Sequence, residues 1–203
     1  MALNVLSGSS DVENLSDIGL LAQAGYLTIK KIQGTTAYVD YPNLEVRTAM
    51  AQLYLEQMLN GKTVEQVGAG NISQLLANGD AESIYHNLNN FLRSIDYRAY
   101  TDIKESTLQS FLQIYLAGAG LKARTEVHNN KGRSDLEVYS GLRHWVFELK
   151  LVRAGQSAEG KLNEAEKQIK ERGYGSSEDR FELKRMAVVF STEKREFVKW
   201  KLC

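Results

Sequence analysis

The sequence predicts an α/β fold in which a mixed β-sheet is flanked by helices. Apolar residues recur at helical spacing in two long segments and alternate with polar residues in several shorter ones. The predicted order is a helix at 102–117, strands at 123–128, 135–139 and 144–151, a helix at 158–172, and strands at 186–191 and 196–201. Because a long helix between strands acts as a crossover, this order indicates a mixed sheet.

The two helices of this core are predicted from their apolar faces and their ends. In the first helix the apolar face contains Leu108, Phe111, Leu112, Tyr115 and Leu116. Gly118 and Gly120 then end the helix. In the second helix Leu162, Ala165 and Ile169 lie one turn apart, with Lys and Glu outside.

A predicted β-hairpin at 132–151 turns at Ser140-Gly141 and carries three charged residues. Glu148 and Lys150 are two positions apart on its second strand, so their side chains leave the same face. Asp135 begins the first strand, and in a short hairpin the start of one strand faces the end of the next. The hairpin therefore places two carboxylates and an ammonium at one end of the sheet.

This set of side chains suits the metal-assisted hydrolysis of a phosphodiester. Mg²⁺ takes oxygen ligands, which Asp135, Glu148 and the backbone carbonyl of Leu149 would supply. The metal would lower the pKa of a bound water. Lys150 would orient that water and stabilise developing negative charge.

Asp135 followed by Glu148-Leu149-Lys150 resembles the motif of the PD-(D/E)XK nuclease superfamily. The flanking sequences narrow this resemblance to one type of domain within the superfamily. They are GRSD at 132–135, FELK at 147–150, and a following helix that contains Gln168 and precedes Tyr174. They are similar to the nuclease-like domain found C-terminal to an AAA-ATPase-like domain in many bacterial proteins. The resemblance covers residues 100–203.

The resemblance implies a restriction-endonuclease-like fold, a DNA substrate and Mg²⁺ or Mn²⁺ as cofactor. Its implied catalytic residues are Asp135, Glu148, Lys150 and Gln168, and its implied metal ligands are Asp135, Glu148, Leu149 and Glu105. Glu105 lies in the first turn of its helix, where an acid also complements the helix dipole. Glu126 and His128 share one face of their predicted strand, and either would lie near the metal. His128 is the weaker candidate for that position.

The Glu-x-Lys triplet is weak support by itself, because Glu182-Leu183-Lys184 repeats it 34 positions later. This second copy follows a polar run at 176–180 and has no hairpin partner that starts with an acid. We interpret it as the approach to a strand. For the first copy, the alternative interpretation is an exposed edge hairpin with ordinary surface charges.

The N-terminal half reads as a wing-like module followed by helices. A helix at 14–25 and a hairpin at 26–41 form the module, and segments 20–30 and 41–47 resemble the end of the ATPase-like domain. Helices are predicted at 44–60, at 64–76 with Thr63 as cap, and at 81–94. We therefore expect the end of an ATPase-like domain at 1–45, a helical linker segment at 46–98 and the nuclease-like domain at 99–203.

Two other N-terminal features carry residue types that occur in binding sites. Gly61-Lys62-Thr63 does not form a phosphate loop, because Glu56 stands where the first glycine is required and the flanks are helical. Lys30 and Lys31 of the wing would touch nucleic acid or simply form a solvated turn. Residues 1–13 are small and polar and are expected to be a flexible lead-in.

Composition indicates an ordinary globular chain of 203 residues, 43% hydrophobic and 25% charged. It lacks an apolar run of the roughly 20 residues that a membrane helix needs, so a cytoplasmic location and no membrane partner are expected. Cys203 is the sole cysteine, which excludes an intrachain disulfide and a cysteine-based zinc site.

The net charge is zero, but its distribution is uneven. Residues 1–120 carry 7 Lys and Arg against 12 Asp and Glu, whereas residues 121–203 carry 18 against 13. The basic half contains the hairpin and suits a polyanion, although five net charges also fall within ordinary variation. The sequence thus favours a metal-dependent DNA endonuclease. The alternative is a catalytically silent nuclease-like fold that serves as a nucleic-acid-binding or assembly module.

Overall fold

The computed structural model describes residues 16–63, 65–129, 132–175 and 180–203. The chain divides into two compact units, residues 1–50 and 51–203. The predicted lead-in at 1–13 lies outside the described residues. Among the helices of the described part, none is long and apolar enough to cross a membrane.

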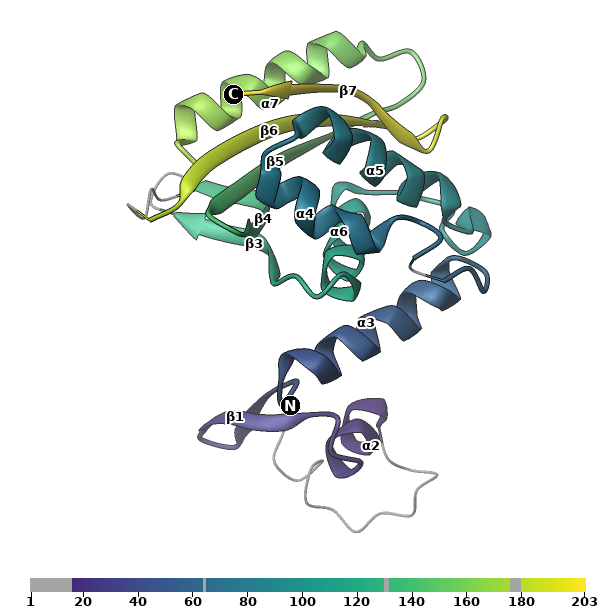
Figure 1. Ribbon diagram of the computed structural model, residues 1–203, viewed down its shortest axis with the longest axis vertical. Coiled ribbons are helices and arrows are strands. Elements are labelled where there is room, and N and C mark those ends of the chain that lie inside the picture. Colours follow the sequence, from purple (N-terminus) through teal and green to yellow (C-terminus); the bar gives the residue numbers. More distant parts are fainter. Residues whose placement is uncertain (1–15, 64, 130–131, 176–179) are drawn as a thin grey trace. The chain divides into compact units, whose positions relative to one another are not determined.

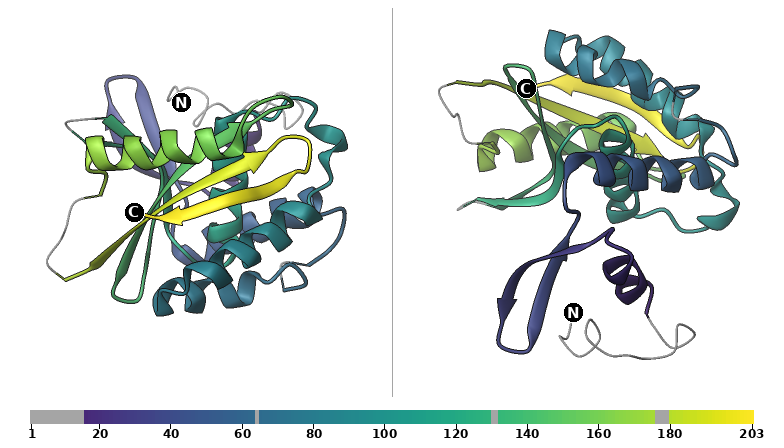
Figure 2. Two further views of the ribbon diagram at one scale, coloured as in Figure 1. Left: turned by 90° about the horizontal axis from the view of Figure 1, so that it is seen from above. Right: turned by 60° about the horizontal axis from the view of Figure 1, so that its bottom comes forward.

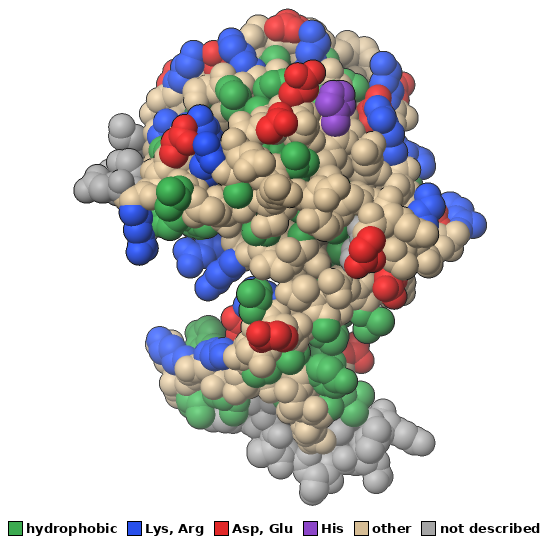
Figure 3. All heavy atoms as spheres, viewed as in Figure 1, with side chains coloured by type: hydrophobic (Ala, Val, Ile, Leu, Met, Phe, Trp, Pro, Cys, Tyr) green, Lys and Arg blue, Asp and Glu red, His purple; other side chains and the backbone are tan. Residues whose placement is uncertain are grey.

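The first unit contains the predicted helix and hairpin. Helix α2 (Asp17–Gln23) starts at Ser16, whose hydroxyl accepts a hydrogen bond from the N–H of Gly19 at 3.2 Å. Strands β1 (Thr28–Gln33) and β2 (Thr36–Asp40) then pair antiparallel. Figure 3 shows hydrophobic side chains gathered on the visible face of this unit. The large apolar side chains exposed on the unit are Ile18, Leu20, Tyr26, Ile29, Ile32, Tyr38 and Leu44.

The helices between the hairpin and the sheet are α3 (Leu44–Met58), α4 (Ala69–Asn78), α5 (Ala81–Ser94), the short η2 (Tyr97–Ala99) and α6 (Glu105–Gly118). The prediction that α4 starts at 64 with Thr63 as its cap was wrong. The N–H of Thr63 instead donates to the side chain of Gln66 at 3.0 Å. Gly68, with φ 83°, precedes the helix in a left-handed conformation that favours glycine.

The second unit is built on a five-stranded sheet in the order β3-β4-β5-β6-β7 (Figure 1). The strands are β3 (Ala123–Asn129), β4 (Gly132–Ser140), β5 (Arg143–Val152), β6 (Glu182–Ser191) and β7 (Glu196–Leu202). Only β5 and β6 pair in parallel, and α7 (Ala158–Arg172) connects them as predicted. The predicted α/β class with a mixed sheet flanked by helices is confirmed.

Helices cover both faces of the sheet (Figure 2). Trp145, Phe147 and Leu149 of β5 belong to the large apolar core that includes residues of α4, α5 and α6. Val146, between two of them, belongs to the smaller core formed with α7. Because side chains alternate along a strand, the even-numbered residues of β5 point to the α7 face, and this rule places Glu148 and Lys150 there.

The second Glu-x-Lys triplet is part of a strand, so its assignment as the approach to one was wrong. Glu182 is the first residue of β6 and lies beside Arg143 at the far end of β5. Glu148 lies beside Ala187, five positions further along. At about 3.3 Å per residue the two triplets are roughly 16 Å apart along the sheet.

Asn89 of α5 is expected to stabilise edge strand β7. It is 2% exposed, its amide donates to the carbonyl of Phe197 at 2.9 Å, and its carbonyl accepts from the N–H of Phe197 at 2.7 Å. In Asn89→Ala the carbonyl of Phe197 keeps the hydroxyl of Tyr85, but its N–H loses its acceptor. Urea denaturation should show a loss of about 1–3 kcal/mol. Asn90→Ala, on the exposed side of the same helix, should leave the midpoint unchanged.

Candidate active site

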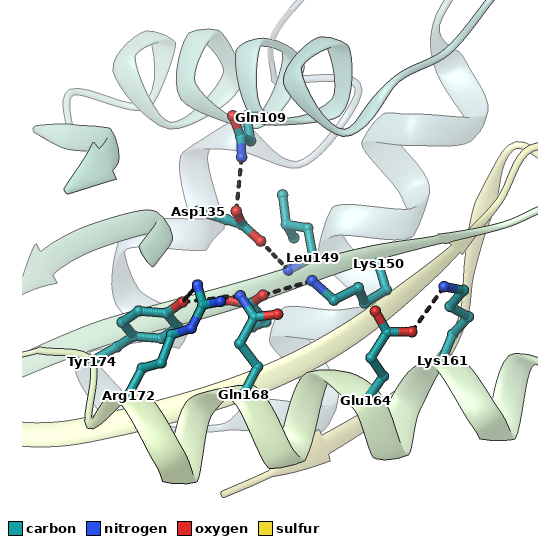
Figure 4. Close-up of polar contacts among 10 residues, drawn as sticks. Gln109, Asp135, Leu149, Lys150, Lys161, Glu164, Gln168, Arg172 and Tyr174 are labelled. Atoms are coloured by element: carbon teal, nitrogen blue, oxygen red, sulfur yellow. Dashed lines mark hydrogen bonds and ion pairs between the residues drawn. The ribbon is translucent and has the colours of Figure 1, made fainter. Parts of the chain in front are cut away.

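Strands β4 and β5 bring together the three residues predicted from the hairpin. The N–H of Leu149 donates to Oδ2 of Asp135 at 2.8 Å, and Nζ of Lys150 donates to Oε1 of Glu148 at 2.8 Å (Figure 4). Asp135 and Lys150 are 8% exposed and Glu148 is 0% exposed. The alternative of an exposed edge hairpin was therefore wrong, because β5 is the central strand and helices cover both of its faces.

Helix α6 contributes a residue that sequence reasoning missed. Nε2 of Gln109 donates to Oδ1 of Asp135 at 3.0 Å, and Gln109 is buried. Glu105, one helical turn earlier, is half-buried and lies close enough for its charge to raise the pKa of Asp135 and Glu148. The spacing of four residues between Glu105 and Gln109 was the one signal in the sequence, since such residues share a helix face.

Burial and mutual repulsion raise the pKa values of Asp135 and Glu148, which we call the acidic pair. Burial, and next the charge of Asp135, raise the pKa of Glu148 from 4.5 to about 7, and the hydrogen bond from Lys150 offsets this only in part. Burial also raises the pKa of Asp135, although the N–H of Leu149 opposes it. Burial alone would lower the pKa of Lys150, but the hydrogen bond to Glu148 and the neighbouring carboxylates outweigh it and raise that pKa.

The residues present fit a divalent cation. Oε2 of Glu148 is buried and has no hydrogen-bond partner among the described residues, which is costly for a carboxylate unless a cation or water meets it. Within the described part of the chain, no three His, Cys, Asp or Glu side chains gather as a metal site. The donor set is therefore a carboxylate pair completed by waters and a carbonyl such as that of Leu149, which is the type of coordination that Mg²⁺ adopts.

A cleft of about 520 Å³ opens at Asp135. Four cations and three acids are among its lining residues, which are Lys104, Glu105, Ser106, Gln109, Glu126, Arg133, Asp135, Leu151, Arg153, Gln156 and Lys161. Glu148 and Lys150 do not line it. The acidic pair is thus reached from the cleft through Asp135.

Strand β3 places only one of its two candidates at the cleft. Glu126 lines the cleft, forms an ion pair with Arg133 at 3.1 Å and has a φ of 54°, which is uncommon for a residue other than glycine. This backbone conformation interrupts the regular alternation that the sequence predicted. His128 pairs with Arg133 in the strand register but does not line the cleft.

Helix α7 brings a polar group to the same side of the sheet. Nε2 of Gln168 donates to the hydroxyl of Tyr174 at 2.9 Å, and Nη1 of Arg172 donates to the same oxygen at 3.0 Å. Figure 4 shows Gln168 and Arg172 projecting from α7 toward the strand that carries Lys150. Gln168 therefore contacts Tyr174, and among the described residues no hydrogen bond joins it to Asp135 or Glu148.

The mixed five-stranded sheet flanked by helices, with acids and a lysine on neighbouring central strands, defines a restriction-endonuclease-like fold. Residues 103–200 match the family model of the PD-(D/E)XK nuclease superfamily, as the resemblance predicted. The chain is also 29% identical over 185 residues to a protein of Azotobacter chroococcum mcd 1 that is described as "Uncharacterized protein in vnfD 5'region". The alignment covers 86% of this chain and 34% of that protein, so the chain spans about a third of its relative's length.

The raised pKa of Glu148 predicts that metal-free protein loses stability as the pH rises. Below about 4.5 the carboxyl is protonated in both states, and between 4.5 and about 7 only the folded state keeps the proton. In chelator, the free energy of unfolding should therefore fall across this window by about 3–4 kcal/mol, since each pKa unit corresponds to about 1.4 kcal/mol. Urea titrations at several pH values measure this change.

Two variants separate Glu148 from other titrating groups. Glu148→Gln should flatten the pH dependence of stability between pH 5 and 8, whatever its absolute stability. Glu182→Gln, at an exposed carboxylate that pairs with Lys184, should keep the wild-type profile. An equally steep fall in Glu148→Gln would show that another group carries the dependence.

Proposed function

We propose that the domain hydrolyses phosphodiester bonds of DNA with Mg²⁺ or Mn²⁺. The observation that carries the proposal is the buried carboxylate of Glu148, whose Oε2 lacks a hydrogen-bond partner beside a second buried carboxylate, Asp135. Such a pair is unfavourable until a cation neutralises it. The match of residues 103–200 to a nuclease superfamily supports the same chemistry.

Each residue has a distinct part in the proposed mechanism. Asp135, Glu148 and the carbonyl of Leu149 would hold the cation, with Glu105 as a further carboxylate. When bound, the cation would lower the pKa of a water and offset charge on the phosphoryl oxygens. Lys150, an ammonium held by Glu148 at 2.8 Å, would orient the water and stabilise the developing charge.

Two further side chains would position these groups. Gln109 holds the carboxylate of Asp135 from the helix side, while the N–H of Leu149 holds it from β5. With both oxygens engaged, Asp135 keeps one orientation before the substrate arrives, which reduces the reorganisation needed for catalysis. Gln168 would act similarly through Tyr174.

The charge of the cleft supports a polynucleotide substrate. Lys104, Arg133, Arg153 and Lys161 line it, and residues 121–203 carry five more cations than anions. Phosphate contacts dominate the affinity of proteins for nucleic acids. The cleft would therefore bind the backbone of DNA and place one phosphate at Asp135.

We also propose that residues 1–45 form the end of an ATPase-like domain of a longer protein. The resemblance of 20–30 and 41–47 to such a domain supports this, as does the greater length of the Azotobacter relative. The apolar side chains exposed on the first unit would then pack against the remainder of that domain.

Substitutions at the acidic pair and the lysine test the proposed hydrolysis. Asp135→Ala or Glu148→Ala should lower the cleavage rate at least 100-fold and weaken the thermal stabilisation by Mg²⁺ or Mn²⁺, because each removes a ligand. Lys150→Ala should lower the rate similarly but keep the metal-dependent stabilisation. Cleavage of plasmid and of single-stranded DNA, with metal and with chelator, measures the first effect and differential scanning fluorimetry the second.

The repeated triplet supplies the matched control. Glu182→Ala and Lys184→Ala remove the same side chains from the other end of the sheet and should leave the rate near wild type. If these variants lose activity while Asp135→Ala and Glu148→Ala retain it, the active site lies at the second triplet and the proposed assignment is wrong. Absence of metal-dependent cleavage by the wild type, also within the longer protein, would favour the silent binding or assembly module.

DNA binding by the cleft should weaken steeply with salt. Each phosphate contact releases counterions and contributes roughly −0.9 to the slope of log K against log salt for duplex DNA. Arg133→Ala should make the slope shallower by about one such contact, as measured by fluorescence anisotropy in chelator. Arg98→Ala removes an exposed cation outside the cleft and should leave the slope of log K against log salt unchanged. Wild-type affinity that hardly changes with salt would point to a protein partner.

A further inference from the structure

Arg172, the last residue of α7, is an exposed cation held by a buried hydroxyl. Its Nη1 donates to the hydroxyl of Tyr174 at 3.0 Å, and Tyr174 is 0% exposed. Gln168 donates to the same oxygen at 2.9 Å and so helps to fix the phenol. A guanidinium has five N–H donors, so this single anchor orients the group and leaves most of its donors for another partner.

Arg172 differs from the cleft cations in what it is paired with. Each cleft cation has a carboxylate partner: Arg133 with Glu126 at 3.1 Å, Arg153 with Asp102 at 3.5 Å, Lys104 with Asp102 at 3.8 Å, and Lys161 with Glu164 at 2.8 Å. Within the described part of the chain, Arg172 has a hydrogen bond to a neutral phenol and no ion pair. Among the described residues, therefore, no direct neighbour neutralises its positive charge.

The position of Arg172 relates it to the acidic pair. The hydrogen bond with Tyr174 and, more weakly, the charges of Glu148 and Asp135 raise its pKa, so the acids lie within electrostatic reach. Figure 4 shows Lys161 and Arg172 at opposite ends of the view along α7, with Asp135 and Lys150 between them. Their 11-residue separation corresponds to about 16 Å along the helix.

We infer that Arg172 binds a backbone phosphate of the substrate on the side of the acidic pair opposite Lys161, so that a DNA strand crosses the site along α7. A strand held on both sides of the scissile phosphate is cut at an internal bond. Arg172 also stands at a helix C-terminus, where a cation interacts favourably with the helix dipole. Lys170 shares that last turn, so it provides the comparison that separates the two roles. This inference rests on the proposed function.

The test is the salt dependence of DNA binding in chelator, measured with a short labelled duplex by fluorescence anisotropy. Arg172→Ala should reduce the slope of log K against log salt by about 0.9, the contribution of one phosphate contact. Arg172→Lys should retain the slope, because the charge remains, but should bind less tightly without the planar fork. Tyr174→Phe keeps the ring but removes the anchor, and should weaken binding about five-fold, as for one net hydrogen bond, with an unchanged slope.

Lys170→Ala is the matched control. It removes one cation from the same helix turn, but Lys170 pairs with Glu166, which also pairs with Lys201 of β7, and neither Lys170 nor Glu166 lines the cleft, so the slope should equal that of wild type. Circular dichroism confirms that each variant is folded. Equal slopes for wild type, Arg172→Ala and Lys170→Ala would overturn the inference and leave Arg172 a helix-end charge.

Cleavage separates this result from the proposed function. If the wild type cuts DNA and Arg172→Ala keeps the wild-type slope, hydrolysis stands and the phosphate contact is refuted. If the wild type binds without cutting and Arg172→Ala loses one contact, the contact stands and the proposed hydrolysis fails. A wild type that neither binds nor cuts refutes both. Cleavage of a closed circular DNA by the wild type supports the internal cut, whereas cleavage only of linear DNA contradicts it.

Discussion

The site depends on one constraint, which is that Glu148 lies on the central strand of a sheet covered by helices on both faces. The side chains in the middle of that strand are buried, so a carboxylate there loses its hydration and must be neutralised or hydrogen-bonded. Lys150 donates to one oxygen, and the other has no partner in the part of the chain that the structure describes. The raised pKa follows directly, because burial and the neighbouring Asp135 penalise the second negative charge.

A third buried carboxylate, Glu137, shows what a carboxylate with both oxygens hydrogen-bonded looks like. Glu137 of β4 accepts a hydrogen bond from Ser134 at 2.7 Å, and its other oxygen lies 2.9 Å from Nε2 of His144. Burial opposes ionisation, but these partners outweigh it and lower the pKa of Glu137. Glu137 and Glu148 thus have similar burial and opposite pKa shifts. The difference is the missing partner, which is why Glu148, and not Glu137, suits cation binding.

The surroundings of the acidic pair distribute charge unequally. The cleft cations are paired with carboxylates, which partly neutralise them. Arg172 is tied to a neutral hydroxyl and keeps its full charge in one orientation. Gln109 and Tyr174 carry no charge but fix the groups that do. Neutral residues therefore orient the charged side chains, while separate cationic residues supply the positive charge around the acidic pair.

The sequence by itself determined the order of the elements and the grouping of Asp135, Glu148 and Lys150 in the candidate site, because both follow from local patterns. Helices α5 and α7 were predicted to the residue, and the hairpin alone brings Asp135 to the N–H of Leu149, next to Glu148 in the chain. The tertiary structure decided the burial of that pair and the contact of Gln109, 26 positions away from Asp135, since packing of distant segments leaves no periodic signal. It also decided the anchoring of Arg172, because a side-chain hydrogen bond depends on orientation and not on spacing.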